Sequence, residues 1–216
     1  MKGKAEVSIL EEKFCLYPEK GLFWASEGIL VISDFHLGKV NHFRRSGIPV
    51  PQSANDQNID RLVSLLQQLK PERVLFLGDL FHSHYNAEWE VFGQVIKYFP
   101  AISFELIRGN HDIMSDYQYL KHQLVMHKEP LTIKSFILSH EPLDRVPEGY
   151  YNLAGHIHPG AHLRGKGRQV IKLPCFYFGA DQALMPAFGE FTGLAKIKPR
   201  KGDQVFVVVE DKVLEF

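Results

Sequence analysis

Cysteine is scarce in this chain of 216 residues, where only Cys15 and Cys175 occur. Small secreted proteins that depend on disulfides carry cysteine at a much higher density. The scarcity excludes a disulfide-stabilised scaffold. We therefore expect both cysteines to be free thiols packed inside the protein, as free cysteine usually is.

An excess of charge of either sign is also absent. Lysine and arginine together number 25, as do aspartate and glutamate, so the formal net charge is zero. This balance argues against a protein coated with basic surface for bulk nucleic-acid binding. It leaves room for a local basic patch.

Long hydrophobic runs are missing as well. No run approaches the roughly 20 apolar residues of a membrane-spanning helix, and Glu6, Glu11 and Glu12 interrupt the N-terminal segment where a signal peptide would lie. The sequence predicts a soluble, cytoplasmic protein that is not inserted in a membrane. With 45% hydrophobic and 23% charged residues, residues 1–216 are expected to form a single domain.

Strand and helix patterns alternate along the first part of the chain. Apolar runs and turn residues predict strands at residues 14–17, 22–25, 28–33, 73–77, 102–107 and 136–138. Helical spacing of apolar residues predicts a helix that ends near Leu69 and another over residues 87–98. The first two strands are expected to pair as a hairpin.

Beyond Tyr150 the pattern changes to short strands divided by glycines. These strands are predicted at residues 163–164, 170–173, 176–178 and 205–209. Strand–helix alternation followed by several strands predicts an α/β fold, in which a sandwich of two mixed β-sheets is flanked by helices.

Polar side chains follow five predicted strands at the point where each strand ends. Histidine is frequent in the chain, with 11 residues, and several of them lie at these ends. The side chains that we consider candidate ligands are Asp34, His36, Asp79, Asn110, His140, His156 and His158. Ligands of open α/β sheets bind outside the carboxyl ends of strands, so these side chains are expected to share one crevice.

This donor set combines carboxylate, imidazole and amide groups. It suits manganese, iron or zinc, and it holds too much nitrogen for a dedicated calcium or magnesium site. Seven ligands are too many for one ion with an open position, but they fit two ions that share a bridging carboxylate. Each motif alone is common in ordinary loops, and the prediction depends on their order and on their place at strand ends.

The motifs are SDFHLGK, GDLFH, RGNHD, SHEP and GHIHPG, between residues 33 and 160. In this order they resemble the motifs of the calcineurin-like metallophosphoesterases. Three longer segments resemble the bacterial DNA-ligase-associated members of that superfamily: FWASEGILVISDFHLGKVNHFRRSGIPVP, LAGHIHPG and LPCFYFGADQALMPAFGEFTG. The last segment lies outside the metal motifs, so shared chemistry does not explain it.

The resemblance implies a role for each candidate ligand. The first metal ion would be held by Asp34, His36 and His158. The second would be held by Asn110, His140 and His156. Asp79 would bridge the two ions, which are expected to be manganese, with iron or zinc as alternatives.

The resemblance also implies a reaction. A metal-bridging hydroxide would hydrolyse a phosphodiester or a phosphomonoester. His111 would be a catalytic histidine that stabilises the transition state or protonates the leaving group, and Asp112 would orient its ring by accepting a ring N–H. DNA repair or nucleic-acid metabolism is the expected context, with a DNA ligase, helicase or nuclease as partner.

Further residues have two interpretations each. His82 and His84 could line the substrate pocket, although an ordinary polar loop is favoured. Two basic clusters could contact a nucleic-acid backbone, although solvated turns are favoured: Arg44 with Arg45, and Arg164 with Lys166 and Arg168. The aromatic segment 176–191 is expected to pack in the core rather than to form a partner surface.

A different class of function also fits the composition. The protein could be a metal-containing binding module in a repair complex with a DNA ligase, nuclease or helicase, with little catalysis of its own. The presence of His111 beside a full ligand set favours the enzyme. The substrate, the choice between diester and monoester, the metal and the oligomeric state stay open at this stage.

Overall fold

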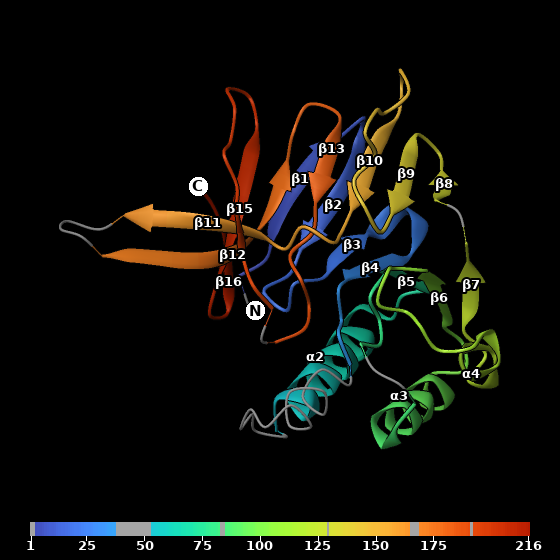
Figure 1. The fold of residues 1–216 in the computed structure, drawn as a ribbon. Helices are drawn as coiled ribbons and strands as arrows, with labels where there is room; N and C mark the ends of the chain where they lie inside the picture. The colour runs from blue at the N-terminus through green and yellow to red at the C-terminus, as the bar shows by residue number, and fades with distance from the viewer. Residues whose placement is uncertain (1–2, 38–52, 83–84, 129, 165–168, 191) are drawn as a thin grey trace.

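The structure is a computed structural model of the chain and describes residues 3–37, 53–82, 85–128, 130–164, 169–190 and 192–216. Two β-sheets stand face to face, and helices cover the first sheet on the side away from the second (Figure 1). This is the predicted α/β sandwich of two mixed sheets, with the described helices on one side only. The residues named above at positions 44, 45, 84, 166 and 168 lie outside the described part.

The first sheet has seven strands among the described residues, in the order β1 to β7. Its strands are β1 (Ala5–Ile9), β2 (Glu12–Leu16), β3 (Leu22–Trp24), β4 (Ile29–Ser33), β5 (Arg73–Leu77), β6 (Ser103–Ile107) and β7 (Val125–His127). Strands β1 to β4 pair antiparallel, and strands β4 to β7 pair parallel. The parallel half therefore brings the carboxyl ends of β4, β5 and β6 to one edge.

The second sheet has nine strands in the described part of the chain. They are β8 (Leu131–Ile133), β9 (Phe136–Ser139), β10 (Tyr151–Ala154), β11 (Pro159–Arg164), β12 (Val170–Phe178), β13 (Gln182–Leu184), β14 (Ala195–Lys196), β15 (Gln204–Val209) and β16 (Lys212–Glu215). Strands β9 and β10 pair parallel, so their carboxyl ends also lie together. Strands β11 and β12 pair antiparallel and project from the body as an arm (Figure 1).

The described helices are η1 (Ala25–Glu27), α2 (Ser53–Leu69), α3 (Ala87–Tyr98) and α4 (Asp116–Lys121). Helix α3 shows why such a segment becomes helical. The side chain of Asn86 caps its first turn by accepting from the backbone N–H of Glu88 at 2.9 Å. Trp89, Phe92 and Ile96 then recur at helical spacing and are buried against the first sheet.

Two hydrophobic cores hold these layers together. One lies between the helices and the first sheet, and the other lies between the two sheets. In the second core, Phe14 and Trp24 of the first sheet meet Phe136 of the second, with ring centroids 4.9–5.2 Å apart. Full burial of side chains of this size contributes roughly 1.5–3 kcal/mol each.

The strand and helix predictions can be compared with these bounds. The predicted β5 and α3 agree with the structure at both ends, and β2 and β3 form the predicted hairpin. Residues 170–173 and 176–178 form one strand, β12, rather than two. It pairs with β11 up to Pro174 and with β13 and β15 beyond it, so the proline marks a change of partner and not a break.

Both cysteines are free, as predicted; Cys175 is buried, whereas Cys15 is half-buried. The aromatic segment packs in the core as expected, since Phe176, Phe178 and Phe188 are buried. Phe188 stacks on Phe35 with ring centroids 4.9 Å apart. No helix in the described residues is long and apolar enough to cross a bilayer.

Candidate metal centre

The predicted crevice lies where the carboxyl ends of β4, β5 and β6 meet those of β9 and β10. His140, which follows β9, makes one of the contacts between the two sheets at this site. Its Nε2 lies 3.0 Å from Oδ1 of Asn110, which follows β6, and 3.5 Å from Oδ1 of Asp79, which follows β5. Residues more than 60 positions apart thus share one site because the two sheets face each other.

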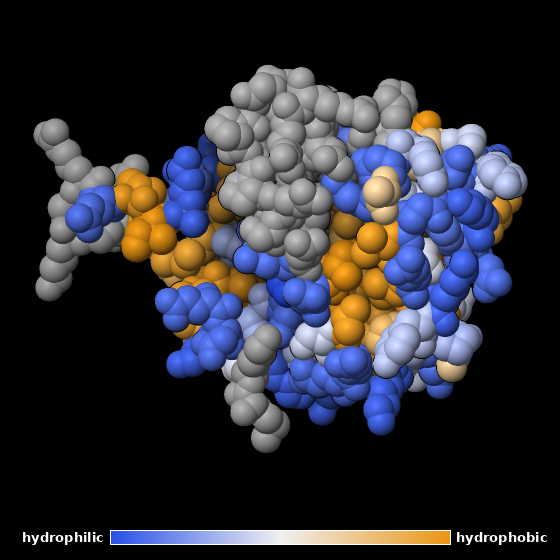
Figure 2. Space-filling model, turned by 90° about the horizontal axis from the view of Figure 1, so that it is seen from below, coloured by the Kyte–Doolittle hydropathy of each residue, from blue (hydrophilic) through white to orange (hydrophobic). Residues whose placement is uncertain are grey.

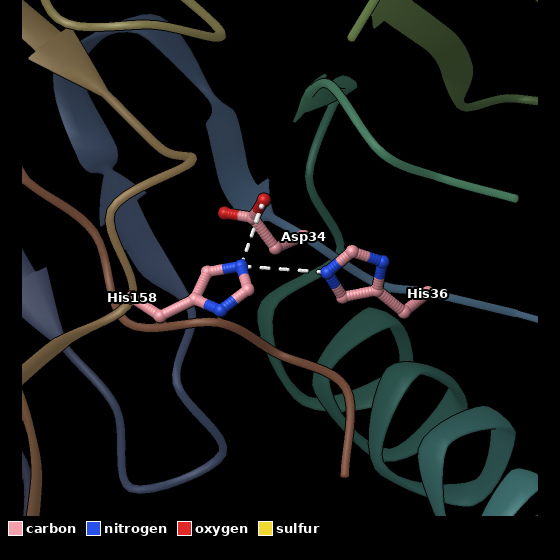
Figure 3. A group of neighbouring side chains, drawn as sticks. All are labelled: Asp34, His36 and His158. Carbon is pink, nitrogen blue, oxygen red and sulfur yellow. Dashed lines mark hydrogen bonds and ion pairs between the residues drawn. The ribbon is translucent and has the colours of Figure 1, made fainter. Parts of the chain in front are cut away.

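The first group of donors consists of Asp34, His36 and His158. Their donor atoms all lie within 4.8 Å of one another. Nε2 of His158 lies 3.2 Å from Oδ1 of Asp34 and 3.4 Å from Nε2 of His36. Figure 3 shows the three side chains pointing toward one another, with Asp34 and His36 in the segment after β4 and His158 in the segment before β11.

The second group of donors includes Asp79 and His140, which lie with Asp34 within the same 4.8 Å limit. Nδ1 of His156 lies 3.1 Å from Nε2 of His140, which brings His156 to the same side as Asn110. All seven predicted ligands are therefore close together, and Asp34 belongs to both groups.

The hydrogen bond of His140 tests whether this cluster suits a cation. Its Nδ1 lies 2.9 Å from the backbone carbonyl of Leu77, which can only accept, so Nδ1 carries a proton. In the neutral ring, Nε2 then presents a lone pair, and it faces the amide oxygen of Asn110, another acceptor. Two acceptors facing each other fit a metal ion, and a ring N–H fixed by a carbonyl is typical of a histidine ligand.

The buried carboxylates also indicate that the cluster suits a cation. Asp34 is 0% and Asp79 2% exposed, and within the described residues their ion pairs are with histidines only. Burial raises the pKa of Asp34, but the contacts with His158, Ser33 and His36 outweigh it, so the pKa lies below its ordinary value. Buried, ionised carboxylates are costly without a cation, and the donor set suits divalent transition metals.

The backbone at the ligands is unusual. Twelve non-glycine residues in the described part have a positive φ. Five of them are candidate ligands with φ between 50° and 65°: Asp34, His36, Asp79, His156 and His158. This conformation costs an L-residue roughly 1–2 kcal/mol. Such strain concentrates at functional sites, where it aims side chains that a strand would direct elsewhere.

Glycines of the motifs allow the strands to approach closely. A Cβ on Gly155 would overlap Oγ of Ser33 and lie 2.8 Å from Oδ2 of Asp34. A Cβ on Gly109 would lie 2.5 Å from the backbone nitrogen of Asp79. Any larger residue at either position would displace a candidate ligand.

His111 lies at the edge of the cluster. Its backbone N–H donates to Oδ1 of Asp79 at 2.9 Å. Its ring Nε2 is 4.0 Å from Oδ2 of the same carboxylate, and the side chain is 44% exposed. The imidazole is thus next to the candidate metal centre and open to a molecule that approaches it.

Asp112 is buried behind this edge. Its Oδ2 accepts from the backbone N–H of Gly109 at 2.9 Å, and its Oδ1 accepts from that of Phe81 at 3.2 Å. Burial raises the pKa of its carboxyl to about 6, although the two amides act in the opposite direction. These bonds tie the loop after β6 to the loop after β5, whereas its predicted bond to the ring of His111 stays a prediction.

His82 is the residue that the sequence interpretation undervalued. Its ring centroid lies 3.9 Å from that of His111 and 5.2 Å from that of His36. Its backbone N–H donates to the carbonyl of Leu37 at 2.8 Å, which fixes the loop after β5 beside the loop after β4. A histidine three positions after Asp79 was the available signal, but the favoured polar loop gave it no role.

A pocket of about 530 Å³ opens beside the second group of donors. Asn110 and His140 contribute to one wall, and Arg108, Lys128 and Leu143 contribute to others. Its volume is in the range of small-molecule sites, so there is room next to the cluster for more than a phosphate group.

Comparisons with solved structures give one close similarity. The Pseudomonas putida nuclease MPE is 27% identical, with a TM-score of 0.85 over 99% of this chain and 100% of that chain. A weaker similarity, with a TM-score of 0.42 and 16% identity over 85% of this chain and 88% of that chain, is to Yfce, a phosphoesterase from E. coli. No curated protein matches the chain in a sequence comparison.

The sequence also matches a known family over most of its length. The match is to the calcineurin-like phosphoesterases, and it covers residues 28–184. This range contains every predicted ligand and both predicted catalytic residues. The chain therefore belongs to the calcineurin-like phosphoesterase family.

Proposed function

We propose that this phosphoesterase is a dinuclear metal-dependent phosphodiesterase that cleaves nucleic acids. The observation that carries the proposal is the cluster of seven donors from two facing sheets, with the half-exposed imidazole of His111 beside it. The similar protein of Pseudomonas putida is a nuclease, which supports a phosphodiester in a nucleic acid over a phosphomonoester.

We propose that the seven ligands are divided between two metal ions, in agreement with the two groups of close donor atoms. Asp34, His36 and His158 would hold one ion. Asn110, His140 and His156 would hold the second. Asp79 is proposed as the bridge; the presence of Asp34 in both groups makes it the alternative bridge. Manganese is the proposed metal, with iron or zinc as alternatives.

The ions would supply Lewis acidity, which lowers the pKa of water and neutralises charge on phosphoryl oxygens. The protein supplies position and protons. The backbone N–H of His111 holds Asp79 in place, and its imidazole, partly open to solvent, is proposed to protonate the oxygen of the leaving group. Asp112 holds the loop that carries Asn110 and His111 by binding the amide of Gly109.

The biological context is proposed on the resemblance of residues 173–193 and of the motifs to DNA-ligase-associated enzymes. We propose that residues 1–216 act as one domain in the cytoplasm, in DNA repair, together with a DNA ligase, helicase or nuclease. Copurification of the protein with such a partner from its own cells is the direct check of this part.

Hydrolysis of two chromogenic esters by metal-stripped protein tests the reaction. The protein is supplied with Mn²⁺ and given bis-p-nitrophenyl phosphate or p-nitrophenyl phosphate, beside a single-stranded and a duplex DNA. We expect Mn²⁺-dependent hydrolysis of the diester and of DNA, and much less of the monoester. Bound metal without hydrolysis of any of the four would overturn the proposal and favour a binding module.

A further inference from the structure

The arm formed by β11 and β12 begins at the candidate metal centre. Strand β11 starts at Pro159, directly after His158, and the backbone N–H of Ala195 donates to the carbonyl of His158 at 3.0 Å. The arm then leaves the body of the protein on the left side of both views (Figures 1 and 2). The position of each residue on the arm is therefore fixed relative to the candidate metal centre.

The charge of the arm differs from that of the whole chain. Residues 159–178 contain no aspartate or glutamate, and they contain four basic residues, Arg164, Lys166, Arg168 and Lys172. The whole chain has equal numbers of acidic and basic residues. Positive charge is therefore concentrated in this segment of a protein without net charge.

On the described part of the arm, His162 and Lys172 lie near Lys196 of the neighbouring β14. His162 lies directly opposite Lys172 in the register of β11 and β12, and Lys196 of β14 is paired with Gly160, two positions before His162. Burial lowers the pKa of His162, and the charges of Lys172 and Lys196 lower it further, because both cations lie near its ring. The two cations near this ring are therefore Lys172 and Lys196, and an anion bound here would be attracted to both.

No carboxylate in the described part of the chain provides that anion. Lys172 and Lys196 have no ion-pair partner among the residues that the structure describes. Both residues are exposed. Their charges are thus available to a ligand from solution.

The two faces of the arm differ in chemistry. Ala161 and Leu173 lie opposite each other and pack with Cys175 in a small hydrophobic cluster. Because side chains alternate along a strand, His162 and Lys172 lie on the other face. Figure 2 shows hydrophilic and hydrophobic residues next to each other on the arm. One face holds the arm to the body, which leaves the basic face to solvent.

The distance between the candidate metal centre and the basic residues of the arm fits a substrate longer than one nucleotide. His162 follows His158 by four positions, so the two are roughly 13 Å apart along an extended strand. Phosphates of one strand of B-form DNA rise about 3.4 Å per nucleotide along the helix axis and also turn around it, so this straight distance corresponds to roughly two nucleotides. A mononucleotide at the metal centre would not reach the basic residues of the arm.

We propose that the basic face of the β11–β12 arm, formed by Lys172 together with Lys196 of the neighbouring β14, binds the phosphate backbone of a nucleic acid roughly two or more nucleotides from the bond that is cut. The arm is a binding element and takes no part in the chemical step. The proposal rests on the proposed function and gives it a substrate of several nucleotides rather than a small phosphodiester.

The test is the salt dependence of binding. Fluorescence anisotropy is measured with the Mn²⁺-loaded full chain and a labelled single-stranded oligonucleotide whose phosphorothioate linkages resist hydrolysis. For the variant Lys172→Ala/Lys196→Ala we expect weaker binding, and the slope of log K against log salt should fall by about 1.5, since each lost phosphate contact removes roughly 0.7–0.9. Lys172→Arg/Lys196→Arg should restore the wild-type slope.

A matched control separates a local contact from a general effect of charge. Lys13→Ala/Lys97→Ala removes the same charge from β2 and α3, and both residues are exposed. The proposal is overturned if this control lowers the slope as much as the arm variant, or if the arm variant binds like the wild type. Thermal unfolding of all variants confirms that they are folded.

Kinetics distinguish this proposal from the proposed function. The loss of kcat/KM that the arm variant shows with DNA should exceed its loss with bis-p-nitrophenyl phosphate at least fivefold, since roughly 1 kcal/mol of phosphate binding is involved. Equal losses with the two substrates would overturn the role of the arm while leaving the phosphodiesterase intact. A wild type without activity on either substrate would instead contradict the proposed function.

Discussion

The imidazole rings of His82 and His111 lie against each other, with centroids 3.9 Å apart and planes inclined by 39°. His82 comes from the loop after β5, and His111 comes from the loop after β6. His82 also lies near His36, with centroids 5.2 Å apart, and the centroids of His36 and His111 are 6.1 Å apart. The ring of His82 therefore packs against the candidate proton donor and beside a candidate ligand, where it limits the positions of the His111 ring.

We expect His82→Ala to lower kcat with a small effect on KM. A shift of a catalytic ring by about 1 Å can lower the rate by up to about a hundredfold. His82→Phe keeps a ring against His111 and should recover part of the rate. Steady-state kinetics on bis-p-nitrophenyl phosphate, with the metal content measured in parallel, check this. Equal kcat values for the alanine variant and the wild type would exclude a positioning role.

The proposed proton donor gives a second prediction. His111→Ala should lower kcat by roughly 10²–10⁴-fold, the usual contribution of a general acid, and should leave both metal ions bound. Elemental analysis of the dialysed variant measures the metal content, and single-turnover hydrolysis measures the rate. Loss of metal in this variant would mean that His111 is a ligand and that its assignment must be revised.

The bridging carboxylate gives a third prediction. Asp79→Asn keeps the shape of the side chain but removes the charge, so metal content and Mn²⁺-dependent stabilisation should both fall. In the wild type, Mn²⁺ at about a hundred times its Kd should add roughly 2.7 kcal/mol to the free energy of unfolding, and EDTA should reverse this. Asp34→Asn is the companion variant: whichever substitution empties both positions identifies the bridge.

The close approach at Gly155 gives a fourth prediction. In Gly155→Ala the new methyl group would overlap Ser33 and crowd the carboxylate of Asp34. Overpacking of this kind destabilises by roughly 1–3 kcal/mol, and metal affinity should fall with it. Gly193→Ala is the control, because a Cβ there meets no atom within 4 Å. Urea unfolding and Mn²⁺ titration of the two variants should therefore differ.

Lys20 gives a prediction for stability at alkaline pH. Burial and the charge of Arg61 together lower its pKa to about 8, although Glu190 acts in the opposite direction. Between pH 8 and 10.5 the folded protein releases this proton, whereas the unfolded chain keeps it up to its ordinary pKa of 10.5. The unfolded state then binds more protons, so the contribution of Lys20 to the free energy of unfolding rises with pH across this window.

The measurement for Lys20 is a comparison with Lys20→Met. The difference in the free energy of unfolding between variant and wild type should shrink as the pH rises from 8 to 10.5, by up to about 3 kcal/mol. Urea unfolding at several pH values gives this difference directly. A difference that does not change with pH would show that Lys20 titrates at its ordinary pKa.

Local patterns predicted much of the fold. The apolar run at residues 73–77 and the helical spacing of apolar residues at 87–98 agree with β5 and α3 at both ends. A strand buried on both faces leaves a continuous apolar run, and a helix buried on one face leaves apolar residues at helical spacing. Strands β1, β7, β8, β13, β14 and β16 were not predicted. Four of them have only two or three residues each, and β1 and β16 are polar strands of five and four residues, so they become strands through pairing with neighbours and not through their own composition.

The sequence by itself determined the chemistry of the site: seven donors at the ends of strands, in an order typical of one family, with glycines beside them. Only the tertiary structure decided which donors meet, that Asp34 lies in both groups, that His82 lies against His111, and that His162, Lys172 and Lys196 share one place on an arm. The physical reason is that residue type and local period are properties of short segments. Contacts between the segments that follow β6 and β9, or between β11, β12 and β14, depend on how the two sheets pack and how their strands pair across the whole chain.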